Sequence, residues 1–311
     1  MRSVSVVIPT FKGRALLEKY LPGLREACRA YDGPVQLIVV DDVSGDDTVA
    51  FLRECYPEVQ VLVNEVNSGF AVAMNRGIAA ATGEIVLALN NDIEVGPDLF
   101  AKPLRWFDDP AVFSVTPNMV YPHNGRSQSI TRLKPGFCWF RALELQPTDL
   151  PTGEGEVSIF FGSGGASFYD RAKLQRLGGF DTVYHPFYIE DIDLSYRAWK
   201  AGWKCLLEPA VTVLHQSNTT IASLHWKRGV KTVADRNRIL FLWLNVTDRD
   251  LIIRYFLFLP LSLVWDLLSG RKYKFVGFFW ALTYLPRIPA LRRQRRELFR
   301  LTDREVFRAV C

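Results

Sequence analysis

The chain has 311 residues, of which 49% are hydrophobic and 23% are charged, as in an ordinary globular protein. These values exclude a disordered or collagen-like chain, and the length suits two domains or one large α/β domain with an appendage. The net charge of +5 resides in residues 286–311, which hold eight Arg against three acidic residues. A nucleic-acid-binding protein more often spreads basic charge over a folded face, so the tail favours an anionic membrane surface and no nucleic-acid partner.

The cysteines are odd in number, widely scattered and free of any CxxC pair. They are Cys28, Cys55, Cys138, Cys205 and Cys311. This pattern predicts neither a zinc site nor a disulfide framework, and it is typical of reduced thiols in a cytosolic protein. The apolar stretch at the N-terminus is too short for a signal peptide, so we expect none.

The first third of the chain alternates between short β-branched runs and segments with helical periodicity. The expected strands are 4–8, 35–40, 59–63 and 85–89, and the expected helices are 16–28, 48–55 and 70–78. Such alternation predicts an α/β fold with a mostly parallel sheet that is covered by helices on both faces.

Polar residues follow three of these strands directly, and the carboxyl ends of parallel strands are where such sheets bind ligands. They are Thr10, Asp41, Asp42, Asn90, Asn91 and Asp92. Taken singly, each acid has an ordinary structural explanation as a helix cap or a turn residue. Together they predict one polar edge of the sheet.

The middle of the chain is less regular. We expect short strands at 112–115, 157–161 and 166–169, helices at 170–177 and 190–201, and two strands at 203–207 and 210–214. From residue 235 the sequence becomes strongly apolar and aromatic. Its longest uncharged runs, 255–265 and 275–286, fall short of the ~20 residues that a spanning helix needs. They favour helices lying in the membrane interface, with a helical core or an oligomer interface as the alternatives.

Five segments occur in a characteristic order: "SVVIPTFKG", "LIVVDDVSGDDT", "NSGFAVAMNRGIAAATGEIVLALNNDIEV", "GSGGASFYDRAKLQRLGGFD" and "YIEDIDLSYRAWKAGW". The chain from Val4 to about Thr220 thereby resembles the family 2 glycosyltransferases with the GT-A fold, and most of all their rhamnosyltransferase-like branch. The resemblance implies a GT-A domain over residues 1–234, with a nucleotide-binding half (1–110) and an acceptor half (111–234). A helical membrane-associating region (235–311) would follow.

The resemblance also implies roles for individual residues. Asp191 matches the catalytic base that takes the acceptor proton, and Glu190 would support it or touch the acceptor. Asp193 lies two residues on, and its spacing to Arg197 predicts a structural ion pair. A helix-capping role is the alternative for Glu190 and Asp191.

A divalent cation, Mn²⁺ or Mg²⁺, is expected from the same resemblance, because the leaving group is a nucleoside diphosphate. Asn90, Asn91 and Asp92 occupy the place of the DxD motif, with Asn90 where the family has its first Asp. His215 matches a downstream histidine that completes the metal shell in some members, and a hydrogen-bonded histidine at a strand end is the alternative.

The nucleotide is expected over the first two strands. The residues assigned to it are Pro9, Thr10, Phe11, Asp41, Asp42, Asn67, Gly69, Arg76 and Asn91. Gly164 and Gly165 would let backbone approach the donor sugar or the acceptor, and Trp203 would stack on a sugar. Tight strand packing, a surface position for Arg76 and a core position for Trp203 are the alternatives.

The expected function is inverting transfer of a sugar from dTDP-rhamnose or a UDP-sugar to a lipid-linked or cell-surface glycan, in polysaccharide or cell-wall synthesis. The enzyme would lie in the cytoplasm, peripheral on the inner face of the membrane and bound through residues 240–311, and it could form oligomers. A non-catalytic nucleotide- or glycan-binding module of the same fold is the alternative. A sugar-1-phosphate nucleotidyltransferase is disfavoured because no GxG follows the first strand, and a membrane scaffold leaves the acidic motifs unexplained.

Overall fold

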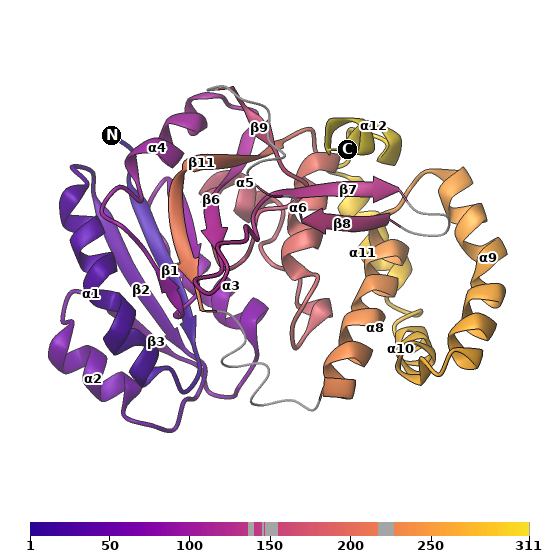
Figure 1. Cartoon of the computed structure of the whole chain (residues 1–311), viewed down its shortest axis with the longest axis horizontal. Coiled ribbons are helices and arrows are strands. Elements are labelled where there is room, and N and C mark those ends of the chain that lie inside the picture. The colour runs from indigo at the N-terminus through magenta and orange to yellow at the C-terminus, as the bar shows by residue number, and fades with distance from the viewer. Residues whose placement is uncertain (136–139, 145, 147–154, 217–226, 311) are drawn as a thin grey trace.

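The computed structural model describes residues 1–135, 140–144, 146, 155–216 and 227–310. The molecule is elongated, with a β-sheet toward one end and a layer of helices toward the other (Figure 1). Cys28, Cys55 and Cys205 are free thiols, as expected. Cys138 and Cys311 lie outside the described residues.

Nine strands form the main sheet, in the order β3-β2-β1-β4-β10-β6-β11-β5 with β9 paired to β11. Their bounds are β1 Val4–Thr10, β2 Val35–Asp41, β3 Gln60–Val63, β4 Ile85–Leu89, β5 Ile93–Glu94, β6 Val112–Val120, β9 Val157–Ser158, β10 Ala166–Asp170 and β11 Lys204–His215. A separate antiparallel pair joins β7 (Thr131–Pro135) to β8 (Phe140–Glu144).

The sheet is mixed: the expected parallel order holds for β1 to β4 and for the pair of β6 and β11, and the remaining pairings are antiparallel. Strand β10 is antiparallel to both β4 and β6, because the chain re-enters the sheet at the edge where β4 ends, with Ala166 opposite Leu89. Strands β5 and β9 are antiparallel to β11. The two strands expected at 203–207 and 210–214 are one strand, β11, whose register against β6 shifts between Glu208 and Thr212.

The helices alternate with the strands in the first half and follow one another in the second. Their bounds are α1 Arg14–Ala30, α2 Thr48–Cys55, α3 Phe70–Ala80, α4 Ala101–Arg105, α5 Arg171–Arg176, α6 Glu190–Lys200, α8 Lys227–Asn245, α9 Arg249–Leu268, α10 Lys272–Leu282, α11 Ile288–Arg296 and α12 Asp303–Val310. Helix α2 has the bounds expected from the sequence.

Helices cover both faces of the sheet, as expected, because successive side chains of a strand point to opposite faces. In β1, Val6 and Ile8 pack into a core with α1, α2 and α4. Val7 packs on the other face, with α3, α5 and α6. This second core continues without a break into α8 and reaches Val306 of α12, so the C-terminal helices share a core with the sheet.

The C-terminal region is helical, as the sequence predicts, but the expected boundary at 234/235 falls inside α8. Helix α9 also runs through Arg254, Pro260 and Asp266, which divide its apolar stretch in the sequence. Among the described residues, α9 is the one helix that is long and apolar enough to cross a bilayer, by length and composition alone.

Candidate active site

The polar residues that follow β1, β2 and β4 meet at one edge of the sheet. Asn91 donates from Nδ2 to Oγ1 of Thr10 over 2.8 Å. The Asp42 amide donates to the carbonyl of Thr10 over 2.8 Å. Gly13 fits beneath this contact because a Cβ there would lie 2.0 Å from the Thr10 hydroxyl and 2.5 Å from Nδ2 of Asn91. Residues 10–13 and 91 therefore form a close-packed floor at the ends of the strands.

The Asp41 and Asp42 carboxylates are both buried and both hydrogen-bonded. Asp41 accepts from the amide and the hydroxyl of Ser44. Asp42 accepts from Nδ2 of Asn64 over 2.6 Å and from the amides of Ser68 (2.9 Å) and Gly69 (2.8 Å). Asp42 therefore holds the loop that leads into α3, in addition to the contact with the nucleotide that is expected of it.

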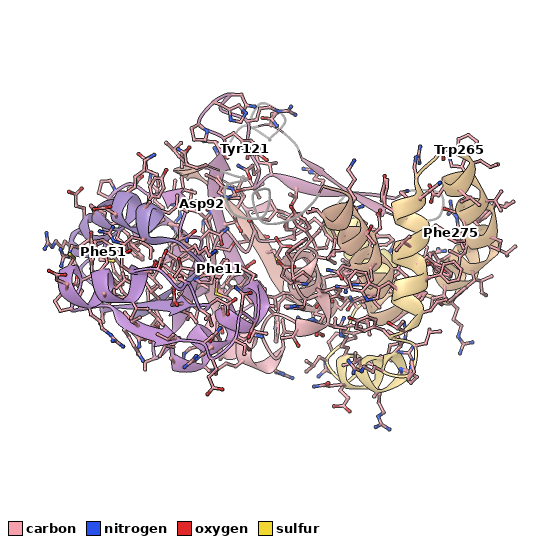
Figure 2. The ribbon with its side chains drawn as sticks, turned by 90° about the horizontal axis from the view of Figure 1, so that it is seen from below. Phe11, Phe51, Asp92, Tyr121, Trp265 and Phe275 are labelled. Carbon is pink, nitrogen blue, oxygen red and sulfur yellow. The ribbon has the colours of Figure 1, made fainter. Side chains whose placement is uncertain are left out.

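The other residues expected at the nucleotide surround this loop. Asn67 donates from Nδ2 to the Asp42 carbonyl over 3.1 Å. Arg76 donates to Oδ1 of Asn64 over 2.7 Å, which ties its guanidinium to the outer side of the same loop. Pro9 lies within β1, and Phe11 follows it with a half-buried ring. Figure 2 shows Phe11 and Asp92 in the sheet-containing half of the molecule.

Asp92 and His215 are brought together by the short antiparallel pairing of β5 with the end of β11. Asp92 Oδ1 lies 3.4 Å from His215 Nε2, and His215 Nδ1 lies 3.0 Å from Oε1 of Gln128. When Nδ1 carries the proton and donates to Gln128, the lone pair on Nε2 is directed toward the carboxylate. A carboxylate oxygen and an imidazole nitrogen at this separation can share a proton or a cation.

This donor set fits a divalent cation. A carboxylate and a neutral imidazole are ligands that suit Mn²⁺, and a donor diphosphate would add further oxygens. Within the described residues, no group of three or more His, Cys, Asp and Glu lies together. The third expected ligand, Asn90, contributes an amide, and its Nδ2 lies beside Gly165.

Asp191 lies in the first turn of α6, opposite the end of β4. Gly164 and Gly165 bridge the two: the Gly165 carbonyl accepts from the Asn90 amide over 2.8 Å, and the Gly164 amide donates to Oδ2 of Asp191 over 3.4 Å. A Cβ on Gly164 would lie 3.0 Å from the Phe70 ring. The two glycines thus allow a close approach between the end of β4, which Asp92 follows, and the helix that carries Asp191.

Two adjacent carboxylates at the start of α6 are hard to ionise together. Partial burial raises the pKa of Asp191, and amide donors, Ile192 first, offset part of that rise. Burial and then the charge of Asp191 raise the pKa of Glu190 to about 8. Oε2 of Glu190 has no hydrogen-bond partner among the described residues. A carboxylate pair with raised pKa values is suited to accept a proton near neutral pH.

Asp193 points away from this site, as the helical spacing predicts, and its ion pair with Arg197 (2.6 Å) is confirmed. The structure adds Arg295 of α11, whose Nη1 lies 2.7 Å from Asp193 Oδ1. Tyr184 and Asn245 donate to the same oxygen. The two arginines hold the pKa of Asp193 at about 2 although the side chain is 0% exposed.

Trp203 is the expected site residue that the structure does not bring to the site. It precedes Lys204, which pairs with Val112 at the start of β6, and the site lies where β6 ends. Its ring stacks on Phe113 with centroids 6.2 Å apart, under the guanidinium of Arg176. The core position left open by the sequence is therefore the one that Trp203 occupies.

Sequence reasoning missed Arg236 and Asn237 of α8, which contact the turn before Asp191. They lie about 50 residues from that turn in the sequence. The sequence around a helical Asn does not show whether its side chain will be buried or exposed to solvent. The buried Arg-Asn pair becomes visible only when α8 is placed against the turn.

Comparison with known proteins places this arrangement in a family. Residues 5–178 match the family model described as "Glycosyl transferase family 2". The chain is also 29% identical, over 244 residues, to the N-acetylglucosaminyl-diphospho-decaprenol L-rhamnosyltransferase of Mycobacterium tuberculosis. That alignment covers 68% of this chain and 75% of the relative.

Solved structures share the fold. The mannosyltransferase PcManGT from Pyrobaculum calidifontis, in complex with GDP-Man and Mn²⁺, aligns with a TM-score of 0.56 and 18% identity, over 96% of this chain and 85% of its own. GalNAc-T7 with UDP, GalNAc and Mn²⁺ aligns with a TM-score of 0.63 and 18% identity. This second alignment covers 78% of this chain and 48% of the neighbour, so the chain spans about half of that protein.

Proposed function

The chain belongs to glycosyl transferase family 2, and we propose that it is an inverting transferase acting on a glycan hydroxyl. The donor would be dTDP-rhamnose or a UDP-sugar, and the acceptor a lipid-linked or cell-surface glycan. Similarity to a rhamnosyltransferase whose substrate is named as a diphospho-decaprenol supports a rhamnosyl donor and a lipid-linked acceptor.

One observation carries the proposal: the Gly164–Gly165 bridge between the base candidate and the end of β4. Asp191 accepts the proton of the acceptor hydroxyl, whose oxygen forms a bond to the anomeric carbon. The bond from that carbon to the donor phosphate oxygen breaks, and the nucleoside diphosphate leaves with the electron pair. Attack opposite the leaving group inverts the anomeric carbon, so the base and the diphosphate must lie on opposite sides of the sugar.

The diphosphate would lie over Asp92 and His215, which would hold a divalent cation together with Asn90. A bound cation would neutralise the charge that develops on the leaving diphosphate. The complexes of two fold neighbours with Mn²⁺ support this choice of cofactor. The nucleoside would lie over the ends of β1 and β2, beside Phe11 and the loop that Asp42 clasps.

The acceptor would approach from the side of Glu190 and the glycines. Glu190 has an unpartnered oxygen and a raised pKa, so it is suited to donate or accept a hydrogen bond with a sugar hydroxyl. This role keeps Glu190 distinct from the base, which has its oxygens held by backbone amides.

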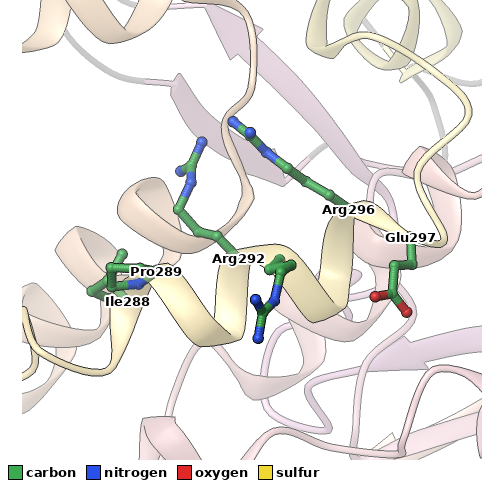
Figure 3. A pocket seen from close by; sticks show the side chains of 6 residues that line it. Ile288, Pro289, Arg292, Arg296 and Glu297 are labelled. Atoms are coloured by element: carbon green, nitrogen blue, oxygen red, sulfur yellow. The ribbon is translucent and has the colours of Figure 1, made fainter.

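The C-terminal helices would place the enzyme on a membrane, at the cytoplasmic face and peripherally. Large apolar side chains on α9 and α10 are exposed, among them Leu261 (67%) and Trp265 (64%). A cavity of about 610 Å³ on α11 is lined by Arg292, Arg293 and Arg296 with two apolar residues and Glu297, and Figure 3 shows Arg292 and Arg296 projecting from this helix. Arg293 and Arg296 are exposed, whereas Arg292 is half-buried and donates to the carbonyls of Trp243 and Val246. Apolar helices together with exposed arginines are suited to the interface of an anionic bilayer.

Two measurements test the proposal. The first is a thermal-shift panel of UDP, dTDP, GDP and CMP, each with and without Mn²⁺. A nucleotide at 100 times its dissociation constant adds about 2.7 kcal/mol, and we expect a shift for one nucleoside diphosphate in the presence of metal. The second is transfer from dTDP-rhamnose, UDP-glucose or UDP-N-acetylglucosamine to a synthetic N-acetylglucosaminyl-diphospho-lipid, read by mass spectrometry.

The outcomes separate the transferase from a non-catalytic module. Product of the opposite anomeric configuration to the donor supports the proposal. Metal-dependent nucleotide binding without turnover of any donor, either to the acceptor or to water, would favour the binding module. Retention of configuration in the product would overturn the direct displacement.

A further inference from the structure

The turn that precedes the base has a conformation that side chains rarely adopt. Tyr188 and Ile189 both lie in the left-handed region, with φ of 69° and 81°. This conformation is especially unfavourable for a β-branched residue such as Ile189. Such strain persists only where the surroundings over-determine it. Because Ile189 is the N-cap of α6, the geometry of this turn sets the direction in which Glu190 and Asp191 leave it.

One side chain makes three of the four described side-chain hydrogen bonds to the backbone of residues 184–189. Asn237 of α8 is 0% exposed, and its Nδ2 donates to the carbonyls of Tyr184 (2.7 Å), Phe187 (2.9 Å) and Tyr188 (2.9 Å). Three acceptors share two N–H groups, so the amide gathers three carbonyl groups around one point. Two of these carbonyls precede the strained pair, and the third belongs to Tyr188, its first member.

Arg236 fixes the orientation of this amide. Its Nε and Nη2 donate to Oδ1 of Asn237 over 2.9 and 2.7 Å, so the NH₂ group must face the turn. The same Nη2 donates to the His185 carbonyl. The guanidinium lies 4.1 Å from the ring centroid of Trp280 on α10, and this cation–π contact stabilises the position of Arg236.

We propose that Asn237 is a positioning residue for the base: it holds the left-handed turn at Tyr188–Ile189 and thereby aims Asp191 at the acceptor hydroxyl. The inference rests on the proposed function of Asp191. Only a neutral amide suits the position, because a carboxylate would repel the three carbonyls and an apolar side chain would leave them unpaired. Asn237 is 0% exposed and its NH₂ group contacts the turn, so its effect on transfer passes through the turn.

The kinetic test compares Asn237→Ala with Asn237→Asp, using the donor and acceptor that the wild type turns over. Asp has the shape of Asn but no N–H donors, and Arg236 beside it can pair with the new charge. We expect kcat to fall about 100-fold in both variants, with Asp at least as impaired as Ala and KM for the donor within about twofold of the wild type. Arg238→Ala, at a solvent-facing neighbour that pairs with Asp235, should keep the wild-type kcat.

A packing role predicts a different order of effects. Near-wild-type turnover of Asn237→Asp alongside an impaired Asn237→Ala would overturn the proposal, and so would a parallel loss of donor affinity and kcat in both. The pH profile adds a further readout. A misplaced base should shift the acidic limb of kcat/KM, whereas a general loss of folded enzyme would scale the profile without moving it.

Hydrogen exchange tests the same idea without any turnover. We expect the amides of residues 188–193 to lose protection at least tenfold in Asn237→Ala, while those of β1 and β4 keep theirs. Unchanged protection at 188–193 would overturn the positioning role even if transfer were lost. If the wild type turns over no donor, the proposed function fails while this measurement still decides whether Asn237 holds the turn.

Discussion

The sheet and the C-terminal helices differ in where they place apolar and charged side chains. The sheet buries its apolar side chains, whereas the C-terminal helices expose many of theirs and bury an ion pair. In the sheet, apolar side chains such as Leu87 fill the interior, and the carboxylates lie at one edge, where backbone amides satisfy Asp42. In the helical layer, Leu261 and Trp265 face outward. The ion pair of Asp193 and Arg295 is enclosed.

The difference in exposed apolar surface indicates which region contacts water and which contacts another surface. A helix that faces water places its apolar stripe inward, and a patch as large as that on α9 and α10 marks an interaction surface. The enclosed ion pairs connect the layer to α6 instead: this helix carries the proposed base Asp191 on one side and presents Asp193 to Arg295 of α11 on the other. One helix thus belongs to both regions, and changes on its two sides should have different consequences.

Asp191→Asn should have the largest effect, and only on chemistry. Loss of the base should lower turnover by about 10³-fold or more. The neutral amide should leave stability unchanged or higher at pH 8, because burial raises the pKa of Asp191 and so penalises its charged form. Turnover and thermal unfolding are measured on the same samples. Wild-type turnover would contradict the assignment of the base.

Arg295→Met should have the opposite signature, a loss of stability. The substitution leaves Asp193 and Asp181 without a cation that lies 2.7 and 2.5 Å from them. Removing one partner of a buried pair costs about 3–5 kcal/mol, which urea unfolding would detect. Arg293→Met, at an exposed neighbour on the same helix, is the matched control and should cost less than about 0.5 kcal/mol. Equal stability of the two variants would show that the enclosed pair is not structural.

Asp92→Ala should remove the metal dependence of nucleotide binding. Loss of the carboxylate beside His215 should weaken Mn²⁺-dependent affinity for the nucleoside diphosphate on the order of 10- to 100-fold, at least as much as loss of an outer-shell partner. Titration calorimetry with and without Mn²⁺ measures the difference. The same affinity in both conditions, for wild type and variant alike, would remove Asp92 from the metal site.

Leu261→Gln should distinguish the role of the exposed face of α9 in membrane binding from the role of the buried core in stability. At 67% exposure the change should cost little stability, yet it should weaken co-sedimentation with vesicles of phosphatidylglycerol at least about tenfold, since a buried Leu contributes about 1.5–3 kcal/mol. Leu240→Gln, at 0% exposure on α8, is the control and should destabilise the fold strongly. Point changes suit this test better than deletion, because α8 and α11 contribute Asn245 and Arg295 to the buried network. If folded Leu261→Gln bound vesicles as strongly as the wild type, the exposed face of α9 would not be the membrane-binding surface.

The sequence was most informative where neighbours along the chain decide the structure. Helical periodicity predicts the helix at 48–55, and the i,i+4 spacing predicts the pairing of Asp193 with Arg197. Partners distant in the sequence were not predictable. The charge count assigned Arg295 to a basic tail, yet it lies buried against Asp193, 102 positions earlier.

The edge of the sheet was predictable for a related reason. Parallel strands bring their carboxyl ends together whatever the rest of the chain does, so Thr10 and Asn91 had to meet. The order of strands beyond β4 depends instead on long insertions, and no local pattern encodes it. The role proposed for Asn237 was not predictable for the same reason, because it depends on the packing of α8 against the turn.

Stability should also depend on pH, and Glu190 should carry much of this dependence. Its pKa is raised to about 8 in the folded chain, above the ordinary value of 4.5, so the folded state binds the proton more tightly than the unfolded state. Stability therefore falls as the pH rises from about 4.5 to about 8 and levels off above that. Asp193, with its pKa held at about 2, is ionised in both states throughout this range and adds no slope.

Glu190→Gln isolates this effect. The melting temperature of the variant minus that of the wild type should increase from pH 5 to pH 8 and then remain constant, because only the wild type must release a proton from a buried carboxyl. Glu26→Gln, at an exposed position on α1, should give a flat difference over the same range. Parallel curves for Glu190→Gln and the wild type would mean that Glu190 ionises normally in the folded chain. Its proposed readiness to exchange a hydrogen bond with an acceptor hydroxyl near neutral pH would then lose its basis.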